Sequence, residues 1–180
     1  LSILFVWGLA ETTGKLRYRS VIAGVSTGAL VLLLIITTRH QLKYWENSIA
    51  LFTHTLAVTE NNYIAHANLG DALDKRGRYG EAIQQYREAL RIRPDDAFVY
   101  YRLATDLDIA GRPDDAILYY KKSLQLDPGN ARVHSNLGVT LITRGNIVDA
   151  KKHFRAALQL DPDLGNAHYN LGLALASEGD

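Results

Sequence analysis

Residues 69–94 read LGDALDKRGRYGEAIQQYREALRIRP, and residues 137–162 read LGVTLITRGNIVDAKKHFRAALQLDP. The second stretch repeats the Leu-Gly pair, the central glycine and the closing proline of the first at the same relative positions. The segment between them repeats the central glycine and the closing proline and has Leu103-Ala104 in place of the Leu-Gly pair, so the pattern recurs every 34 residues. The recurring positions are Gly77, Gly111 and Gly145; Ala82, Ala116 and Ala150; Tyr86, Tyr120 and Phe154; and Pro94, Pro128 and Pro162.

Each unit carries the pattern of two helices joined by a tight turn. Leu69, Ala72 and Leu73 are spaced i, i+3, i+4 and therefore share one face of a first helix. Gly77 follows as a helix stop, and the apolar pattern resumes in a second helix that Pro94 ends. Because one such pair cannot bury its apolar face alone, we expect the units to stack.

This interval and pattern resemble the tetratricopeptide repeat over residues 63–180. The resemblance implies an all-α, right-handed α-solenoid whose first helices line a concave groove. The expected units are 63–96, 97–130 and 131–164, and residues 165–180 match the first helix of a truncated fourth unit. Residues 42–62 resemble a lone second helix that caps the row, because Ile49, Phe52 and Leu56 match Ile83, Tyr86 and Leu90.

The beginning of the chain has a different composition. Residues 20–38 hold no charged side chain, and as one continuous helix they would extend about 28 Å, close to the thickness of a bilayer core. We therefore predict a transmembrane helix over 20–40, with a buried core helix as the alternative. Residues 1–10 are predicted as the end of a truncated transmembrane helix and residues 11–19 as a short loop, which together with 20–40 would form a helical hairpin.

Membrane localisation and topology follow from this prediction. Lys15, Arg17 and Arg19 lie before the apolar segment, and Arg39 and Lys43 lie after it, a small excess that favours a cytoplasmic loop. The repeats would then be extracytoplasmic, at a bacterial inner membrane or an equivalent one. The expected partners of residues 20–40 are the lipid bilayer and other transmembrane helices of the same parent protein. The chain starts at Leu1 and contains no methionine, so we interpret it as a piece of a longer protein.

Several classes of chemistry find no support in the sequence. The net charge of +1 argues against nucleic acid as a partner, and the absence of cysteine removes thiolate chemistry. His66, His134 and His168 share one repeat position, where packing between helices explains them better than metal ligation. The acidic pairs Asp95-Asp96 and Asp114-Asp115 precede or begin helices and are interpreted as caps and dipole partners. We predict no catalytic residue, no metal and no cofactor in this stretch.

The groove is the functional surface that the sequence supports. Asn68, Asn136 and Asn170 share one repeat position, which Arg102 interrupts. An amide both donates and accepts, so such a column can pair with an extended peptide backbone of any sequence. The column is similar to that in the repeat domain of the O-linked GlcNAc transferase family. The predicted peptide-contacting residues are Asn68, Asp71, Tyr101, Arg102, Thr105, Arg132, Asn136 and Asn170. The same face also carries Asp74, Asp108, Val139, Ile142 and Leu173.

The junction between the apolar segment and the repeats carries a second resemblance. Residues 41–70, QLKYWENSIALFTHTLAVTENNYIAHANLG, resemble membrane proteins with tetratricopeptide repeats that are related to protein O-mannosyltransferases, bacterial multi-span relatives included. That family transfers a sugar from a lipid-linked donor to protein, and no catalytic residue of its pattern falls in this chain. We therefore predict a membrane-anchored interaction module that binds a polypeptide. The alternatives are the acceptor-binding arm of a polytopic glycosyltransferase and an assembly scaffold.

Overall fold

The computed structural model describes residues 29–38 and 47–177, and every regular element in them is a helix. Residues up to Asn47 and residues from Ser48 onward form two separate compact units. The first holds a helix at 29–38. The helices of the second are α2 (Ser48–Val58), α3 (Tyr63–Asp74), α4 (Tyr79–Ile92), α5 (Ala97–Ile109), α6 (Pro113–Leu126), α7 (Ala131–Thr143), α8 (Ile147–Leu160) and α9 (Gly165–Ala176).

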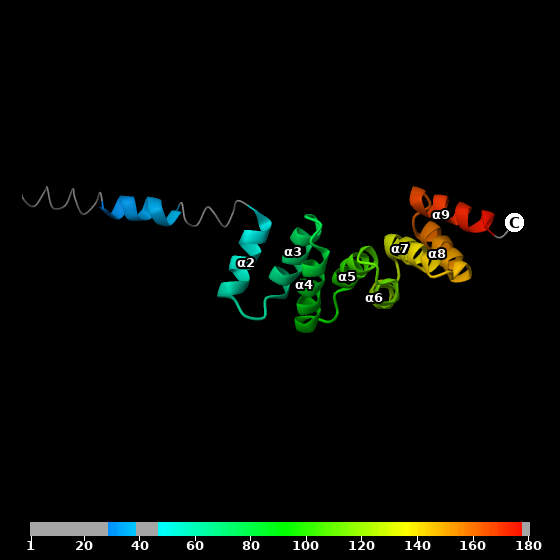
Figure 1. The fold of residues 1–180 in the computed structure, drawn as a ribbon, viewed down its shortest axis with the longest axis horizontal. Coiled ribbons are helices and arrows are strands. Elements are labelled where there is room, and N and C mark those ends of the chain that lie inside the picture. The colour runs from blue at the N-terminus through cyan, green and yellow to red at the C-terminus, as the bar shows by residue number, and fades with distance from the viewer. Residues whose placement is uncertain (1–28, 39–46, 178–180) are drawn as a thin grey trace, which may run out of the picture. The chain divides into compact units, whose positions relative to one another are not determined.

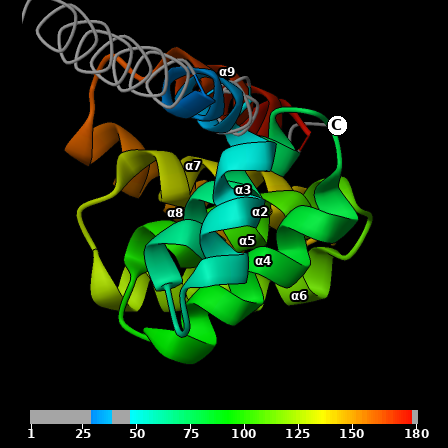
Figure 2. The ribbon, with the colours of Figure 1, turned by 90° about the vertical axis from the view of Figure 1, so that its left-hand side faces the viewer.

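The second unit is a helical solenoid built from successive hairpins. The helices α3 and α4, α5 and α6, and α7 and α8 pack as pairs, and each pair packs on the next (Figure 1). The helix α2 packs on α3 and is the nearest member of the row in the view along it (Figure 2). The first helices α3, α5, α7 and α9 also contact one another in order, so they form one continuous face.

Side-chain caps start three of the four first helices. Asn62, Asp96 and Asn130 each accept a hydrogen bond from a backbone N–H three residues later, at 3.0, 3.1 and 3.3 Å. Such caps satisfy one of the orphan donors of a helix start. The predicted capping role of Asp96 is confirmed. The helix α9 follows Leu164, which provides no side-chain cap.

A glycine follows the end of each of the helices α3, α5 and α7, because the chain turns there through the left-handed region. The φ angles of Gly77, Gly111 and Gly145 are +73°, +74° and +75°. After Gly77 the N–H of Arg78 donates to the carbonyl of Leu73 at 3.0 Å, and the same bond recurs in the next two units. This geometry is the Schellman ending of a helix, and glycine adopts it without a steric penalty.

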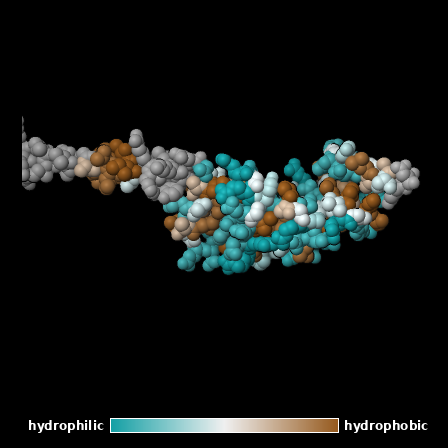
Figure 3. Space-filling view, in the orientation of Figure 1, coloured by the Kyte–Doolittle hydropathy of each residue, from teal (hydrophilic) through white to brown (hydrophobic). Residues whose placement is uncertain are grey.

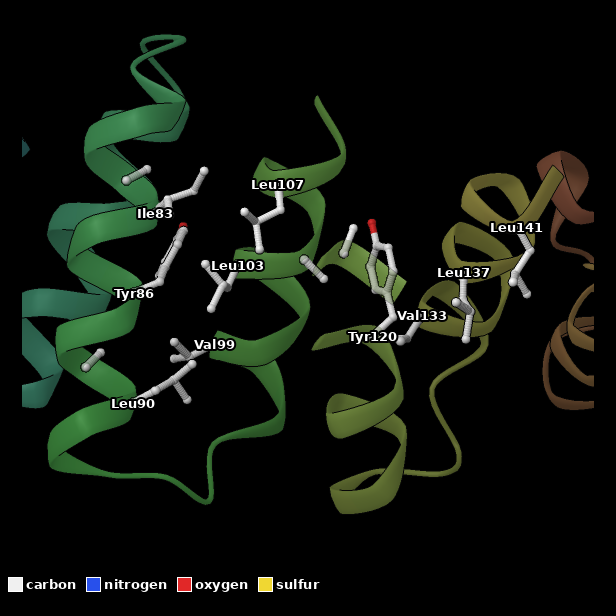
Figure 4. Close-up of a cluster of buried hydrophobic side chains, with 14 of the residues drawn as sticks. Ile83, Tyr86, Leu90, Val99, Leu103, Leu107, Tyr120, Val133, Leu137 and Leu141 are labelled. Atoms are coloured by element: carbon white, nitrogen blue, oxygen red, sulfur yellow. The ribbon is translucent and has the colours of Figure 1, made fainter. Parts of the chain in front are cut away.

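The core lies between neighbouring helices along the row (Figure 4). Its largest side chains are the aromatic residues of the second helices, and Tyr86, Tyr120 and Phe154 are at most 1% exposed. The ring of Tyr86 lies against Gly70, where a Cβ atom would come within 2.7 Å of it. The helices α3 and α4 therefore approach each other closely at this glycine.

The prediction of a membrane-spanning helix and of a membrane localisation is corrected by the structure. In residues 29–38 and 47–177 no helix is long and apolar enough to cross a membrane. Residues 29–38, which lie inside the predicted span, are helical. The described residues give no support to the lipid bilayer or other transmembrane helices as partners, or to the extracytoplasmic placement.

Other predictions concern residues that the structure does not describe. The expected helix end at 1–10, the loop at 11–19, and the parts of 20–40 and 42–62 that fall within 20–28 and 39–46 lie outside the described residues. Within the expected capping half-repeat, the helix α2 begins at Ser48.

Candidate functional site

The predicted asparagine column lies on the face formed by the first helices. Asn68 is exposed on α3, and Asn136 and Asn170 are half-buried on α7 and α9. The amide of Asn136 donates a hydrogen bond to the hydroxyl of Tyr101 at 3.3 Å. Within the described residues, the side chains of Asn68 and Asn170 make no hydrogen bond. Two of the three amides therefore keep their donors and acceptors available.

Arg102, which interrupts the column, is engaged within the protein. Its guanidinium forms ion pairs with Asp71, at 2.5 Å, and with Asp74, and it approaches the Tyr86 hydroxyl at 3.4 Å. Lys75 adds a second cation to Asp71 at 2.6 Å. Burial acts to lower the pKa of Arg102, but the Tyr86 hydrogen bond and the two carboxylates raise it above its ordinary value. The predicted ligand contacts Asp71 and Arg102 thus neutralise each other and join α3 to α5.

A further carboxyl group lies beneath this ion pair. Asp106 on α5 is 1% exposed, and its Oδ2 atom has no hydrogen-bond partner among the described residues. Burial raises the pKa of Asp106 to about 7, and the charge and hydrogen bonding of Asp74 act in the same direction, against the pull of Arg102. Desolvation penalises the charged form, so this group binds a proton far more readily than an exposed aspartate.

Two other predicted residues support the face. The ring of Tyr101 lies 6.3 Å from that of Tyr120 and 6.4 Å from that of Phe98. Thr105 accepts a hydrogen bond from the Tyr120 hydroxyl at 3.2 Å and donates one to the carbonyl of Tyr101 at 3.0 Å. These contacts hold the ring of Tyr101 in place, so it can offer a rigid surface to a ligand. Arg132, the remaining predicted residue, is exposed on α7.

An apolar cavity opens at the other end of the face. It lies between α7 and α9 and has a volume of about 270 Å³. On the side shown in Figure 3, apolar surface gathers over this end of the row, whereas hydrophilic surface predominates over α3 to α6. The lining residues are Val139, Ile142, Thr143, Ile147, Asn170, Leu173, Ala174 and Ser177.

Two of the three histidines in the column contact second helices, and the Nε2 atom of His168 lies 2.8 Å from the carbonyl oxygen of Pro162. The Nδ1 atom of His66 lies 2.8 Å from the Gln85 side-chain oxygen, and the Nδ1 atoms of His134 and His153 lie 3.0 Å apart. Burial, followed by the charge of His134, lowers the pKa of His153. No group of three or more possible metal ligands lies together within the described part of the chain. These contacts fit the packing role that the sequence predicts.

The sequence-based site lacked two features. It placed Asp74, Val139, Ile142 and Leu173 on this face but did not separate a charged end from an apolar one. The signal was present in one repeat position, which reads Asp74, Asp108 and then Ile142. The burial of Asp106 had no comparable signal, because an aspartate on a helix is ordinarily exposed.

Family comparisons agree with this architecture. A TPR repeat family matches residues 70–105, and a tetratricopeptide repeat family matches residues 109–163. The chain therefore contains tetratricopeptide repeats. A comparison with curated proteins finds no match.

Several solved structures are similar in fold. MamA aligns with a TM-score of 0.71 at 21% identity, covering 73% of this chain and 77% of that chain. YrrB, described as a TPR protein with an unusual peptide-binding site, aligns with a TM-score of 0.67 at 22% identity, covering 81% and 73%. The first TPR domain of Spaghetti (RPAP3), bound to an HSP90 peptide, aligns with a TM-score of 0.65 at 18% identity, covering 69% and 99%. None of these comparisons supports the resemblance to proteins related to O-mannosyltransferases.

Proposed function

We propose that this chain is a protein–protein interaction module that binds an extended polypeptide along the face of α3, α5, α7 and α9. The observation that carries the proposal is the column of Asn68, Asn136 and Asn170, in which the first and last amides have no hydrogen-bond partner within the described residues. Backbone amides and carbonyls of an extended peptide are the natural partners for side chains that both donate and accept.

Two similar structures support the proposal by their descriptions. One is bound to an HSP90 peptide, and another has an unusual peptide-binding site. Recognition of a terminal carboxylate is not the mode proposed here. A carboxylate placed beside Asp71 would meet a like charge, and the neighbouring cation Arg102 is already paired with Asp71.

The test uses the 180-residue chain and a random library of short peptides displayed on phage. Enriched peptides are synthesised, and their dissociation constants are measured by fluorescence polarisation for the wild type and for Asn68→Ala combined with Asn136→Ala. One net hydrogen bond is worth about 0.5–1.5 kcal/mol, so the double variant should bind about 5- to 150-fold more weakly.

The matched control removes two amides from second helices. Gln84 and Gln159 are exposed on α4 and α8, and Gln84→Ala combined with Gln159→Ala should bind as the wild type does. An unchanged dissociation constant in a folded asparagine double variant would overturn the proposal. So would a library from which no peptide is enriched.

A further inference from the structure

The three junctions between successive first helices place different chemistry at equivalent positions. Between α3 and α5, the facing residues are Asp74 and the buried Asp106, with Arg102 paired to Asp74. This junction holds an ion pair and a buried carboxyl group whose Oδ2 atom has no partner among the described residues.

The next junction is filled by a neutral hydrogen bond donor and its acceptor. Between α5 and α7, the hydroxyl of Thr140 donates to Oδ2 of Asp108 at 2.9 Å. Asp108 occupies the repeat position of Asp74 in the next unit, and Thr140 occupies that of Asp106. Both polar side chains that meet at this junction therefore have a partner.

The third junction has no such pair. Between α7 and α9, the equivalent residues are Ile142 and Ala174, each one further unit along the chain. An alanine is smaller than the aspartate or threonine of the earlier junctions, and Ala174 is one of the residues that line the cavity of about 270 Å³. Its rim residues Val139 and Leu173 are 39% and 51% exposed, so the cavity opens onto the face of the first helices.

We propose that this cavity, the α7–α9 socket, takes one aliphatic side chain of the peptide that the face binds. The inference rests on the proposed function and assigns the ligand its anchoring residue. The peptide backbone would pass Asn136 and Asn170, and the second of these lines the socket. An amide at the rim can hold the backbone while the neighbouring side chain points inward.

The volume and the uncharged lining of the α7–α9 socket favour an aliphatic side chain as its ligand. Small-molecule sites in proteins are typically about 300–1,000 Å³, so a smaller socket suits a single side chain. Its lining holds no charged residue, and a carboxylate or ammonium group placed there would lose water without gaining a partner. A leucine, isoleucine or valine side chain would instead remove apolar surface from water on both partners.

The experiment is a double-mutant cycle on peptides enriched from the same phage library. We expect these peptides to share one aliphatic position. Replacing that residue with serine should weaken binding to the wild type by about tenfold or more. Ile142→Asp carries the aspartate of the two earlier units into the socket, and it should bind the parent and serine peptides with similar affinity.

Two further variants keep the test decisive. Leu173→Thr reproduces Thr105 at the exposed rim, and it replaces Ile142→Asp if circular dichroism shows that the latter does not fold. Val148 is 59% exposed on α8, so Val148→Asp is the matched control and should retain the preference of the wild type.

The outcomes separate the two proposals. Peptides that need Asn68 and Asn136 but show no aliphatic preference would overturn the socket and leave the groove standing. The socket proposal would also be overturned, and the groove left standing, if folded Ile142→Asp and Leu173→Thr still preferred the parent peptide to the serine peptide as the wild type does. Enrichment of no peptide would overturn both proposals.

Discussion

At the scale of single residues, Gly138 and Gly172 have equivalent positions on α7 and α9 but different surroundings. A Cβ atom on Gly138 would lie 2.6 Å from the ring of Phe154, whereas one on Gly172 would meet nothing within 4 Å. Ala104 occupies this position in the second unit, so an alanine is accommodated only where the facing ring is placed for it. The enclosed glycine is therefore required by packing, and the open one is not.

We expect opposite effects from the same substitution at these two sites. Gly138→Ala should lower the free energy of unfolding by about 1–3 kcal/mol, because Phe154 must move within a packed core. Gly172→Ala should raise it by about 0.5–1 kcal/mol, because alanine is the better helix former. Urea unfolding followed by circular dichroism measures both. Equal effects of the two substitutions would contradict the packing explanation.

At the scale of helices, the junction of α3 and α5 makes stability depend on pH. The folded chain holds the Asp106 proton up to about pH 7, whereas the unfolded chain releases it near pH 4. The folded state therefore binds more protons between these values, and the contribution of Asp106 to the free energy of unfolding falls as pH rises from about 4 to about 7. The facing groups are Asp71 and Asp74 on α3, Tyr86 on α4 and Arg102 on α5 itself.

Asp106→Asn should remove this dependence, since an amide has no proton to lose. We expect the difference in unfolding free energy between the wild type and Asp106→Asn to shift steadily against the wild type from about pH 5 to about pH 7. Because His153 is present in both proteins, the opposite effect of its lowered pKa cancels from the difference.

Two further variants sharpen the comparison. Asp106→Thr reproduces the neutral donor that Thr140 provides to Asp108, and it should follow Asp106→Asn. The matched control is Asp163→Asn, at an exposed aspartate. A constant difference between the wild type and Asp106→Asn across this pH range would show that Asp106 does not hold its proton in the folded chain.

The same junction shows how far the sequence determines the fold and the site. The helices were predictable because residues such as Gly111 and Pro128 mark helix ends, and equivalent residues recur at the same position in every full unit. The pairing of Asp71 with Arg102 was not, because it joins two different units whose contact no local pattern encodes. Repeat positions identify which residues share a face but not which of them bond to each other.

The membrane prediction failed for a related reason. The absence of charge over residues 20–38 indicates an apolar segment, but composition alone sets no helix ends. Capping and turn residues define the ends of the repeat helices, as Asn62 and Gly77 do for α3. No such signals bound the apolar segment, so its composition predicts a helix but not where that helix begins and ends.

At the scale of the solenoid, stability should vary along the row. Each unit of a repeat array contacts only its neighbours, so the free energy needed to open a helix locally depends on how many neighbouring helices it packs against. The helix α5 packs against helices on both sides, and its residues Leu103 and Leu107 are 0% exposed. In α9, Leu173 and Leu175 are 51% and 46% exposed, and no side chain caps its start.

Hydrogen exchange read by mass spectrometry should therefore be faster in residues 165–176 than in residues 97–109, because local opening needs less free energy where fewer apolar contacts are lost. Gly172→Ala should slow exchange in α9 by strengthening that helix, and it should leave α5 unchanged. Gly138→Ala should instead speed exchange in α7 and α8, where the ring of Phe154 is displaced. Uniform exchange from α3 to α9 would mean that the row opens as one cooperative block, and the separate effects of the two glycine variants would then disappear.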